Sequence, residues 1–286
     1  MKKALSILLA MGMTVGMVAG CGDTADNSSA AASTEAGTDG TQAAASAADI
    51  KVGVIYIGDE NEGYTAAHMA GIDEMAANLG LSDDQIIEKT TIPEDESCYD
   101  AAVDLADQGC NIIFATSFGH ETYILQAAQE YPDIQFCHAT GYQAASSGLS
   151  NMHNYFDAIY EARYVSGVVA GMKLNEMIAD GTITEDTAKI GYVGAFPYAE
   201  VISGFTSFYL GAKSQCPSVT MEVQYTNSWA DMSGEAEVAA KLIDDGCVLI
   251  SQHADTTGAP STCEDKKVPC AVSYTHLRAH ETAANL

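Results

Sequence analysis

Short apolar runs alternate with amphipathic stretches along this chain from Ile50 onward. The run KVGVIYI at 51–57 has the continuous hydrophobic character of a buried strand, and a helical pattern follows it over residues 64–79. Further strands are predicted at 86–92, 111–115 and 134–138, and helices at 97–108 and 120–130. Strands and helices that alternate across connections of a few residues are typical of a parallel sheet with crossover helices. The pattern therefore predicts an N-terminal α/β lobe over residues 50–156.

The alternation restarts after a long predicted helix at 157–179. The strands predicted after it are 189–193, 220–225, 248–252 and 268–272, and the helices are 200–214 and 234–245. Two successive units of this kind predict the α/β class, with two doubly wound parallel-sheet lobes. The second lobe would cover residues 157–272, and its first helix would act as a hinge. Ligands in such folds bind beyond the carboxyl ends of the strands, so we expect a cleft between the lobes.

Residues 1–20 have the pattern of a secretory signal peptide. Lys2 and Lys3 precede an apolar run that is too short to span a bilayer, and small residues follow it. The sequence VAGC at 18–21 resembles the bacterial lipobox, in which the cysteine is acylated and becomes the mature N-terminus. This resemblance implies lipidation at Cys21 and anchoring on the extracytoplasmic face of the cell membrane. The alternative is an ordinary signal peptide in which Cys21 has no special role.

Two further segments lie outside the predicted lobes. Residues 22–49 contain no aromatic and no large aliphatic side chain, so residues 21–49 are expected to form a disordered tether. Residues 273–286 (SYTHLRAHETAANL) do not continue the strand and helix pattern, and they resemble a translated sequencing-adaptor artefact. We therefore expect an aberrant tail there, after an incomplete second lobe.

Charge and cysteine content narrow the function. The formal net charge is −27, and such a chain repels nucleic-acid backbones and anionic lipid, so nucleic acid is excluded as a partner. The seven cysteines other than Cys21 are odd in number and include no C-x-x-C pair, so neither a disulfide framework nor a metal site is predicted. Cys110, Cys137 and Cys247 lie in apolar runs and are expected to be buried. No cofactor is predicted.

The loop after the first predicted strand reads GDENEGYT at 58–65. It has the G-x-x-x-x-G spacing of a phosphate loop, but Tyr64 stands where that motif has a lysine. Three carboxylates in the loop would repel a phosphate at the helix N-terminus, which favours a neutral or cationic ligand. Asp59 would be suited to bind a pair of hydroxyl groups. Its alternative role is that of a solvated acidic turn and helix cap.

Other strand ends supply further candidates. Ser117 and Phe118 follow the third predicted strand, but Ala115 replaces the first glycine of a G-x-S-x-G nucleophile elbow. A Ser–Asp–His triad would have to use Asp255 and a histidine of the aberrant tail, His276 or His280. In the second half, the loops after strands carry aromatic residues together with polar ones (Phe196, Tyr198, Trp229, His253 and Asp255). Rings beside a few polar groups favour a flat ligand that carries hydroxyl groups.

Several segments together resemble the basic membrane protein (BMP) family, the PnrA-like substrate-binding lipoproteins of ABC importers. These segments are KVGVIYIGD at 51–59, ATSFG at 115–119, NYFDAIYEARY at 154–164, GVVAGMK at 167–173, IGYVGAFP at 190–197, TNSW at 226–229 and QHAD at 252–255. The resemblance implies a type I periplasmic-binding-protein fold, no enzymatic activity, and partnership with an ABC permease and its ATPase subunits.

The resemblance also implies a ligand, commonly a purine nucleoside, and roles for individual residues. Tyr64 and Phe205 would stack on the base, and Asp59 and Asp255 would hold the ribose hydroxyls. The cleft would also be lined by Ser117, Phe118 and Trp229. The chain departs from the family where Gly63-Tyr64-Thr65 replaces a Phe-Asn version of the first loop, and where a later return to the first lobe is missing. A receptor for another solute, such as a sugar or signalling molecule, and an α/β hydrolase are the alternatives.

Overall fold

The computed structural model describes residues 47–272. The predicted signal peptide, Cys21, most of the tether and the tail at 273–286 lie outside the described residues. Ala47–Asp49, at the end of the predicted tether, forms a 3-10 turn, η1. The side-chain amides of Gln85 and Asn111 hold this turn by donating to the carbonyl oxygens of Ala47 and Asp49, at 2.8 and 2.6 Å.

The first lobe is a five-stranded parallel sheet with the strand order β2-β1-β3-β4-β5. Its strands are β1 (Val52–Ile55), β2 (Ile86–Lys89), β3 (Ile112–Ala115), β4 (Gln135–Ala139) and β5 (Met152–Tyr155). Its helices are α2 (Gly63–Leu79), α3 (Glu96–Asp107), α4 (Glu121–Glu130) and the short α5 (Ala144–Ser147). Two 3-10 turns, η2 (Asp83–Gln85) and η3 (Phe118–His120), complete the lobe.

The first sheet is buried on both faces, as its apolar strands require. All four residues of β1 are buried. On one face Ile55 packs with residues of α3 and α4, and on the other Val52 and Val54 pack with partly buried residues of α2. Gly53 lets α3 pack closely on the sheet, because a Cβ there would lie 2.9 Å from a Leu105 methyl group.

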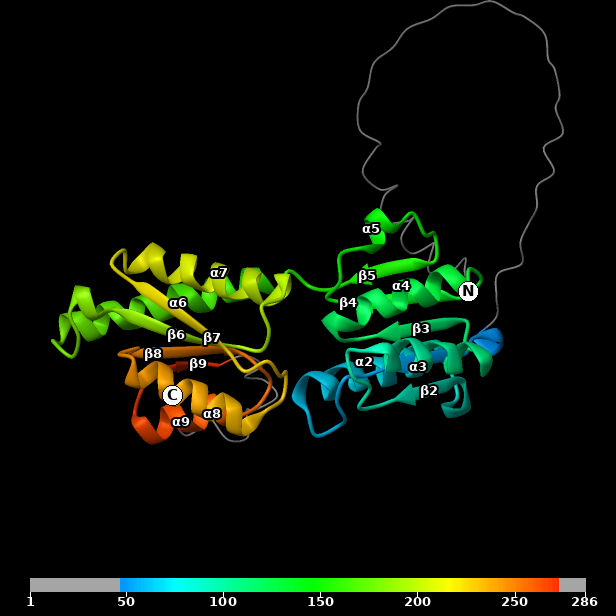
Figure 1. Ribbon diagram of the computed structural model, residues 1–286, viewed down its shortest axis with the longest axis horizontal. Helices are drawn as coiled ribbons and strands as arrows, with labels where there is room; N and C mark the ends of the chain where they lie inside the picture. The colour runs from blue at the N-terminus through cyan, green and yellow to red at the C-terminus, as the bar shows by residue number, and fades with distance from the viewer. Residues whose placement is uncertain (1–46, 273–286) are drawn as a thin grey trace, which may run out of the picture.

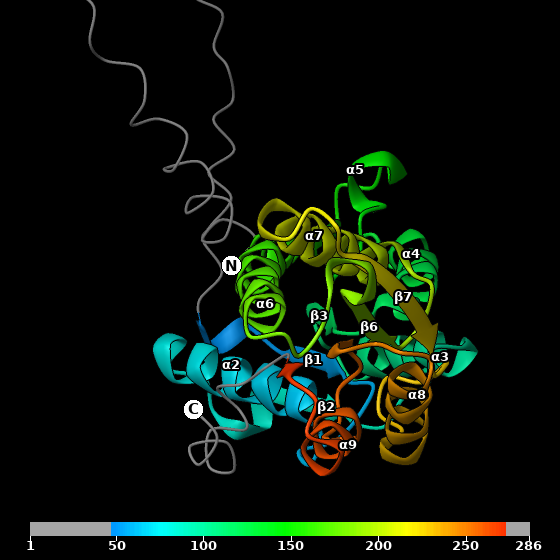
Figure 2. The ribbon, with the colours of Figure 1, turned by 90° about the vertical axis from the view of Figure 1, so that its left-hand side faces the viewer.

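The second lobe is a four-stranded parallel sheet with the order β7-β6-β8-β9. Its strands are β6 (Lys189–Gly194), β7 (Thr220–Tyr225), β8 (Leu249–His253) and β9 (Cys270–Ala271). Its helices are α6 (Ile159–Ala179), α7 (Ala199–Gln215), α8 (Met232–Asp244) and α9 (Gly258–Lys266), with a 3-10 turn, η4 (Glu185–Thr187). Residues of α6 and α7 share one core cluster with the sheet, and residues of α8 and α9 share another on the opposite face (Figure 2).

The two lobes lie side by side (Figure 1). Within residues 47–272 the chain crosses from the first sheet to the second once, between Tyr155 and Ile159. The predicted class, two doubly wound parallel-sheet lobes, is confirmed by this topology. Two helices, α5 and α9, and one strand, β5, were not predicted. No helix among the described residues is long and apolar enough to span a bilayer.

Candidate functional site

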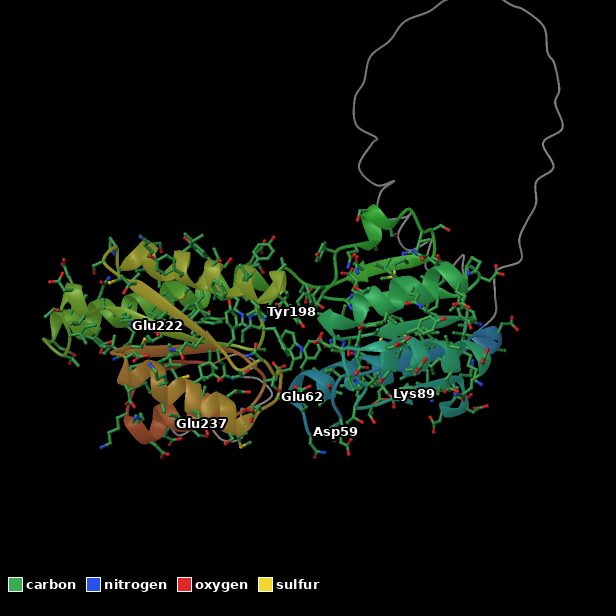
Figure 3. All side chains as sticks on the ribbon, in the orientation of Figure 1. Asp59, Glu62, Lys89, Tyr198, Glu222 and Glu237 are labelled. Atoms are coloured by element: carbon green, nitrogen blue, oxygen red, sulfur yellow. The ribbon has the colours of Figure 1, made fainter. Side chains whose placement is uncertain are left out.

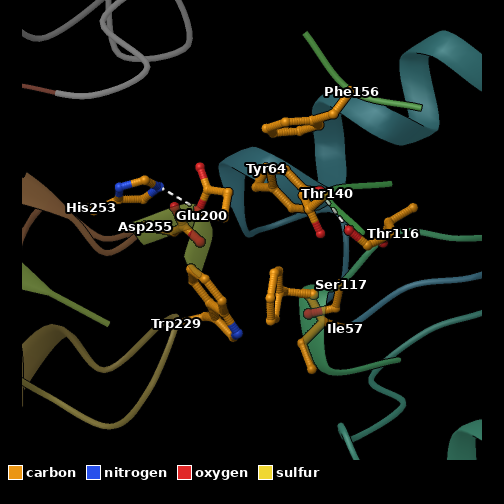
Figure 4. Close-up of a pocket in the computed structure, with 11 residues that line it drawn as sticks. Ile57, Tyr64, Thr116, Ser117, Thr140, Phe156, Glu200, Trp229, His253 and Asp255 are labelled. Carbon is orange, nitrogen blue, oxygen red and sulfur yellow. Dashed lines mark hydrogen bonds and ion pairs between the residues drawn. The ribbon is translucent and has the colours of Figure 1, made fainter. Parts of the chain in front are cut away.

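A pocket opens between the lobes, where strands of both sheets end (Figure 4). Its volume is about 360 Å³, counting the space at its mouth. Because the carboxyl ends of parallel strands meet at one edge of a sheet, loops that are distant in sequence converge there. The first lobe contributes Ile57, Tyr64, Thr116, Ser117, Phe118, Thr140 and Phe156, and the second contributes Glu200, Trp229, His253 and Asp255.

Aromatic rings form much of the pocket wall, and they come from both lobes. They are Tyr64, Phe118, Phe156 and Trp229. Phe118 also stacks on Tyr198 of the second lobe, with ring centroids 4.9 Å apart and planes 19° apart. Tyr198 in turn stacks on Phe196, at 4.9 Å. The rings offer a flat ligand extended apolar contact.

The first loop fixes Tyr64 at the pocket. Glu62 caps α2, because its carboxylate accepts from the backbone N–H groups of Tyr64 and Thr65 at 2.5 and 2.7 Å. At its far end the Tyr64 hydroxyl donates to the carbonyl oxygen of Thr116, at 2.5 Å. The ring is therefore held at both ends. The tyrosine that replaces the phosphate-loop lysine bridges α2 to the end of β3.

Asp59 lies beside the pocket rather than in it. It lines an adjoining opening, which also includes Tyr64 and Asp255. One carboxylate oxygen of Asp59 accepts from both the backbone and the side-chain N–H groups of Asn61, at 2.9 and 3.1 Å. Figure 3 shows Asp59 and Glu62 at the edge of the first lobe that faces the second. Asp59 and Asp255 thus approach the same opening from opposite lobes.

Two carboxylates of the second lobe face the pocket in different electrostatic settings. The pKa of Asp255 is raised well above its ordinary value. The main cause is burial, followed by the negative charges of Glu62 and Glu235 and a smaller contribution from Glu200. The buried Arg163 guanidinium opposes this shift only in part. Asp255 therefore keeps its proton to a higher pH than an ordinary aspartate does.

Glu200 is held by a histidine. Its carboxylate lies 2.8 Å from Nε2 of His253, whose Nδ1 is 3.4 Å from the Tyr192 hydroxyl. Burial and the Arg163 guanidinium lower the pKa of His253, and Glu200 offsets part of this effect. The pair sets the direction of the Glu200 carboxylate at the pocket wall (Figure 4).

Ser117 is 3% exposed, and its hydroxyl donates to the carboxylate of Glu94 at 2.6 Å. The nearby His138 contacts the backbone carbonyl of Ser117, not its hydroxyl, at 2.7 Å. Ser117 is thus engaged with a carboxylate and lacks the Ser–His contact of a hydrolase triad among the described residues.

Phe205 does not join the other predicted residues. Its ring packs edge-on against Tyr192 at 5.8 Å, beside the core cluster formed with α6 and α7. The residue before it, Gly204, packs against His253, since a Cβ there would lie 2.7 Å from Nδ1 of that histidine. Each residue turns a helix by about 100°, so adjacent positions face different neighbours. Tyr64, Ser117, Phe118, Trp229 and Asp255 do come together in the pocket.

The residues of this region that sequence reasoning missed include Glu94, Phe156 and Glu200. Glu94 follows β2, so the rule that strand ends carry ligands would have included it. Glu200 stands in the first turn of α7, where an acidic residue is ordinarily explained by the helix dipole. Among residues 47–272 no group of three or more His, Cys, Asp or Glu side chains is arranged to hold a metal ion.

Comparison with known families gives one match over most of the chain. The family model described as "ABC transporter substrate-binding protein PnrA-like" matches residues 49–268. A purine-binding protein of Brucella abortus is 36% identical over 223 residues, which are 77% of this chain and 58% of that protein. A Haloferax volcanii protein, named provisionally as an ABC transporter glucose-binding protein, is 38% identical over 158 residues, which are 55% of this chain and 37% of that protein. The chain thus spans less than two thirds of these relatives.

Solved structures share the fold. An ABC transporter solute-binding protein from Aeropyrum pernix superposes with a TM-score of 0.65 at 16% identity, over 77% of this chain and 60% of the other. At this identity the likeness concerns the arrangement of the two α/β lobes.

Proposed function

The chain belongs to the family of PnrA-like ABC transporter substrate-binding proteins, and from this we propose that it binds a purine nucleoside in the pocket between its lobes. We further propose that acylated Cys21 anchors the protein on the extracytoplasmic face of the membrane. There it would deliver the solute to an ABC permease and its ATPase subunits. In this proposal the protein binds and releases its solute without changing it.

The observation that carries the proposal is the composition of the pocket wall. Rings from both lobes (Tyr64, Phe118, Phe156 and Trp229) stand next to two carboxyl groups, Glu200 and Asp255. A purine has two flat faces and several N–H groups, and a ribose has hydroxyl groups, so rings and carboxyl oxygens together match its chemistry. The 36% identical relative that is named for purine binding supports the same ligand class.

The roles follow from position. Tyr64, Phe118 and Trp229 would contact the base, and Ser117 would line the floor of the pocket. Asp59 and Asp255, which share an opening at the pocket mouth, would hold the ribose hydroxyls. Phe205 has no role in this proposal, because it packs beside the core of the second lobe.

Delivery would depend on lobe closure. The pocket wall is divided between the lobes, so a solute contacts all of it only when the two lobes are close. The closed, liganded arrangement would then differ in shape from the open one, which gives a permease a surface by which to distinguish them.

A thermal-shift screen of the purified full chain against nucleosides, free bases, sugars and amino acids tests the ligand class. A ligand that binds only the folded state raises stability by RT ln(1 + [L]/Kd), or about 2.7 kcal/mol at a concentration of 100 Kd. We expect guanosine, inosine or adenosine to raise the melting temperature selectively. Response to glucose alone would instead support the sugar alternative, and a cooperative melt with no response to any nucleoside would refute the proposal.

Two phenylalanine variants then test the site. Phe118→Ala removes a ring from the pocket wall, so nucleoside affinity measured by calorimetry should fall about tenfold. Phe205→Ala is the matched control, because it removes a ring beside the core and should lower the melting temperature while leaving affinity nearly unchanged. Chromatography of the bound solute after prolonged incubation should return it unaltered, whereas a product would support the hydrolase alternative.

A further inference from the structure

The side chain of Glu94 forms hydrogen bonds to groups of both lobes. From the first lobe, its Oε1 accepts from the Ser117 hydroxyl at 2.6 Å and from the Gly119 backbone N–H at 2.7 Å. From the second lobe, the same oxygen accepts from the Trp229 indole N–H at 3.1 Å, and Oε2 lies 3.5 Å from the Tyr198 hydroxyl. One carboxylate thus accepts from four donors spread over both lobes.

The surroundings of Glu94 fit this position. The next residue, Asp95, caps α3 by accepting from the Ser97 backbone N–H at 2.9 Å, which fixes the backbone that carries Glu94. On the other side, a Cβ at Gly119 would lie 2.6 Å from Cδ of Glu94. Position 119 therefore has to be glycine for the carboxylate to reach the loop after β3.

A stack of rings reinforces the same junction. Phe118 of the first lobe stacks on Tyr198 of the second at 4.9 Å, and Tyr198 lies 6.1 Å from the Trp229 ring. Figure 3 places Tyr198 at the junction of the lobes. Three of the groups in contact here, Ser117, Phe118 and Trp229, also line the pocket, so whatever holds the junction also shapes the site.

We propose that Glu94 is a positioning residue that stabilises the closed arrangement of the two lobes, and we call this junction the latch. Its carboxylate fixes the Trp229 indole and the Ser117 hydroxyl at the pocket wall. A site that is already assembled binds more tightly, because the apparent dissociation constant is the intrinsic one divided by the fraction of competent molecules. The latch itself follows from the geometry alone, and only its effect on affinity rests on the proposed function.

The latch can be tested without any ligand, because Trp229 is the only tryptophan of the chain. In the full chain, Glu94→Gln removes the charge that strengthens the bonds to both lobes, and Glu94→Asp retracts the carboxylate by one methylene. We expect both variants to shift Trp229 emission to longer wavelength and to raise its quenching by acrylamide. Glu96→Gln, at an exposed glutamate in the first turn of α3, is the matched control and should leave both readings unchanged.

The emission and quenching data can be interpreted only if each variant is folded. Far-ultraviolet circular dichroism should show native helix content in each variant. If Glu94→Gln fails to fold, Tyr198→Phe offers a milder change, since it removes one donor and keeps the ring that stacks on Phe118. Emission and quenching that stay at the wild-type values in folded Glu94 variants would overturn the latch.

Affinity supplies the second test, with guanosine as the probe. Loss of charge-assisted bonds across the junction should raise the dissociation constant of Glu94→Gln about tenfold, with Glu96→Gln unchanged. A tighter complex in Glu94→Gln would overturn the proposal, because it would mean that Glu94 competes with the solute for Trp229. If guanosine binds neither wild type nor variant, the proposed ligand fails while the emission test still decides the latch.

Discussion

Asp255 should make the stability of the protein depend on pH. Because its pKa in the folded state is raised well above 3.8, the folded protein holds this proton more tightly than the unfolded chain does. The free energy of unfolding that Asp255 contributes is therefore greatest below pH 3.8, falls as pH rises toward the raised pKa, and stays low above it.

Asp255→Asn should thus be more stable than wild type at neutral pH, by at least about 1 kcal/mol, and the difference should shrink toward pH 4. Urea denaturation of both proteins between pH 4 and 8 measures this difference in the free energy of unfolding. The control is Asp265→Asn, at an exposed aspartate of α9, which should show no such trend. An Asp255→Asn variant that is less stable at pH 7 would mean that the ionised carboxylate has a stabilising partner.

A residue of the site could be predicted from the sequence where its position in the backbone could be predicted. Tyr64, Ser117, Trp229 and Asp255 follow strands, and strand ends converge in any parallel sheet. Phe205 lies on a helix, where an error of one residue turns the side chain by about 100°. Glu94 follows the strand β2, but nothing near it in the sequence indicates its role, because its four donors come from both lobes and up to 135 residues away.

Two elements escaped prediction for physical reasons. The edge strand β5 (MHNY) has two polar residues among four and pairs on one side only, so it lacks an apolar run. Helix α9 (GAPSTCEDK) has no apolar periodicity, and its buried contacts come from small residues, Gly258, Ala259 and Cys263. Long elements with apolar faces, such as α3 and α8, were placed within two residues at each end.

The pairing of α6 with α7 should depend on glycine. A Cβ at Gly167 would lie 2.0 Å from the backbone oxygen of Phe208, whereas a Cβ at Gly71 in α2 would have no heavy atom within 4 Å. Gly167→Ala should therefore lower the free energy of unfolding by about 3 kcal/mol, because backbone cannot yield as a side-chain tip can. Gly71→Ala, the same change at an open helical site, should raise it by about 0.5–1 kcal/mol.

Urea denaturation of the two alanine variants separates these effects. Loss of stability in both would show that α2 also packs tightly at Gly71. Equal stability of Gly167→Ala and wild type would show that the two helices can move apart at little cost.

At the scale of the whole molecule, the interlobe region is strongly acidic. The pocket and its adjoining openings are lined by Asp59, Glu62, Glu94, Glu200 and Asp255, and among the described residues no lysine or arginine lines them. A phosphate roughly 8 Å from one carboxylate is repelled by about 2 kcal/mol at an effective dielectric constant near 20. If the proposed nucleoside binds, its 5′-monophosphate should bind at least about 30-fold more weakly.

Calorimetry at low and high salt measures the affinities of guanosine and its 5′-monophosphate. The difference between the two affinities should become smaller at high salt, because salt screens the carboxylates. The neutral 5′-O-methyl derivative controls for size at the same position. Monophosphate binding as tight as that of guanosine would require a cation at the pocket that is absent from its described lining.

The two lobes should unfold as coupled but separable units. Each has its own core clusters, and within residues 47–272 the covalent link between the sheets is one crossing before α6. Further links between the lobes include the Glu94 hydrogen bonds and the stack of Phe118 on Tyr198. Coupling of this limited kind predicts that the van 't Hoff enthalpy of the ligand-free protein falls below its calorimetric enthalpy.

Glu94→Ala should lower the ratio of the van 't Hoff enthalpy to the calorimetric enthalpy further, because it removes hydrogen bonds that join the lobes. Guanosine bound between the lobes should raise the ratio toward one, since it stabilises only the state in which both lobes are folded. Differential scanning calorimetry of wild type, Glu94→Ala and the Glu96→Ala control gives all three values. A ratio of one in every protein would mean that the lobes form a single cooperative unit, so that the junction at Glu94 would not be what couples them.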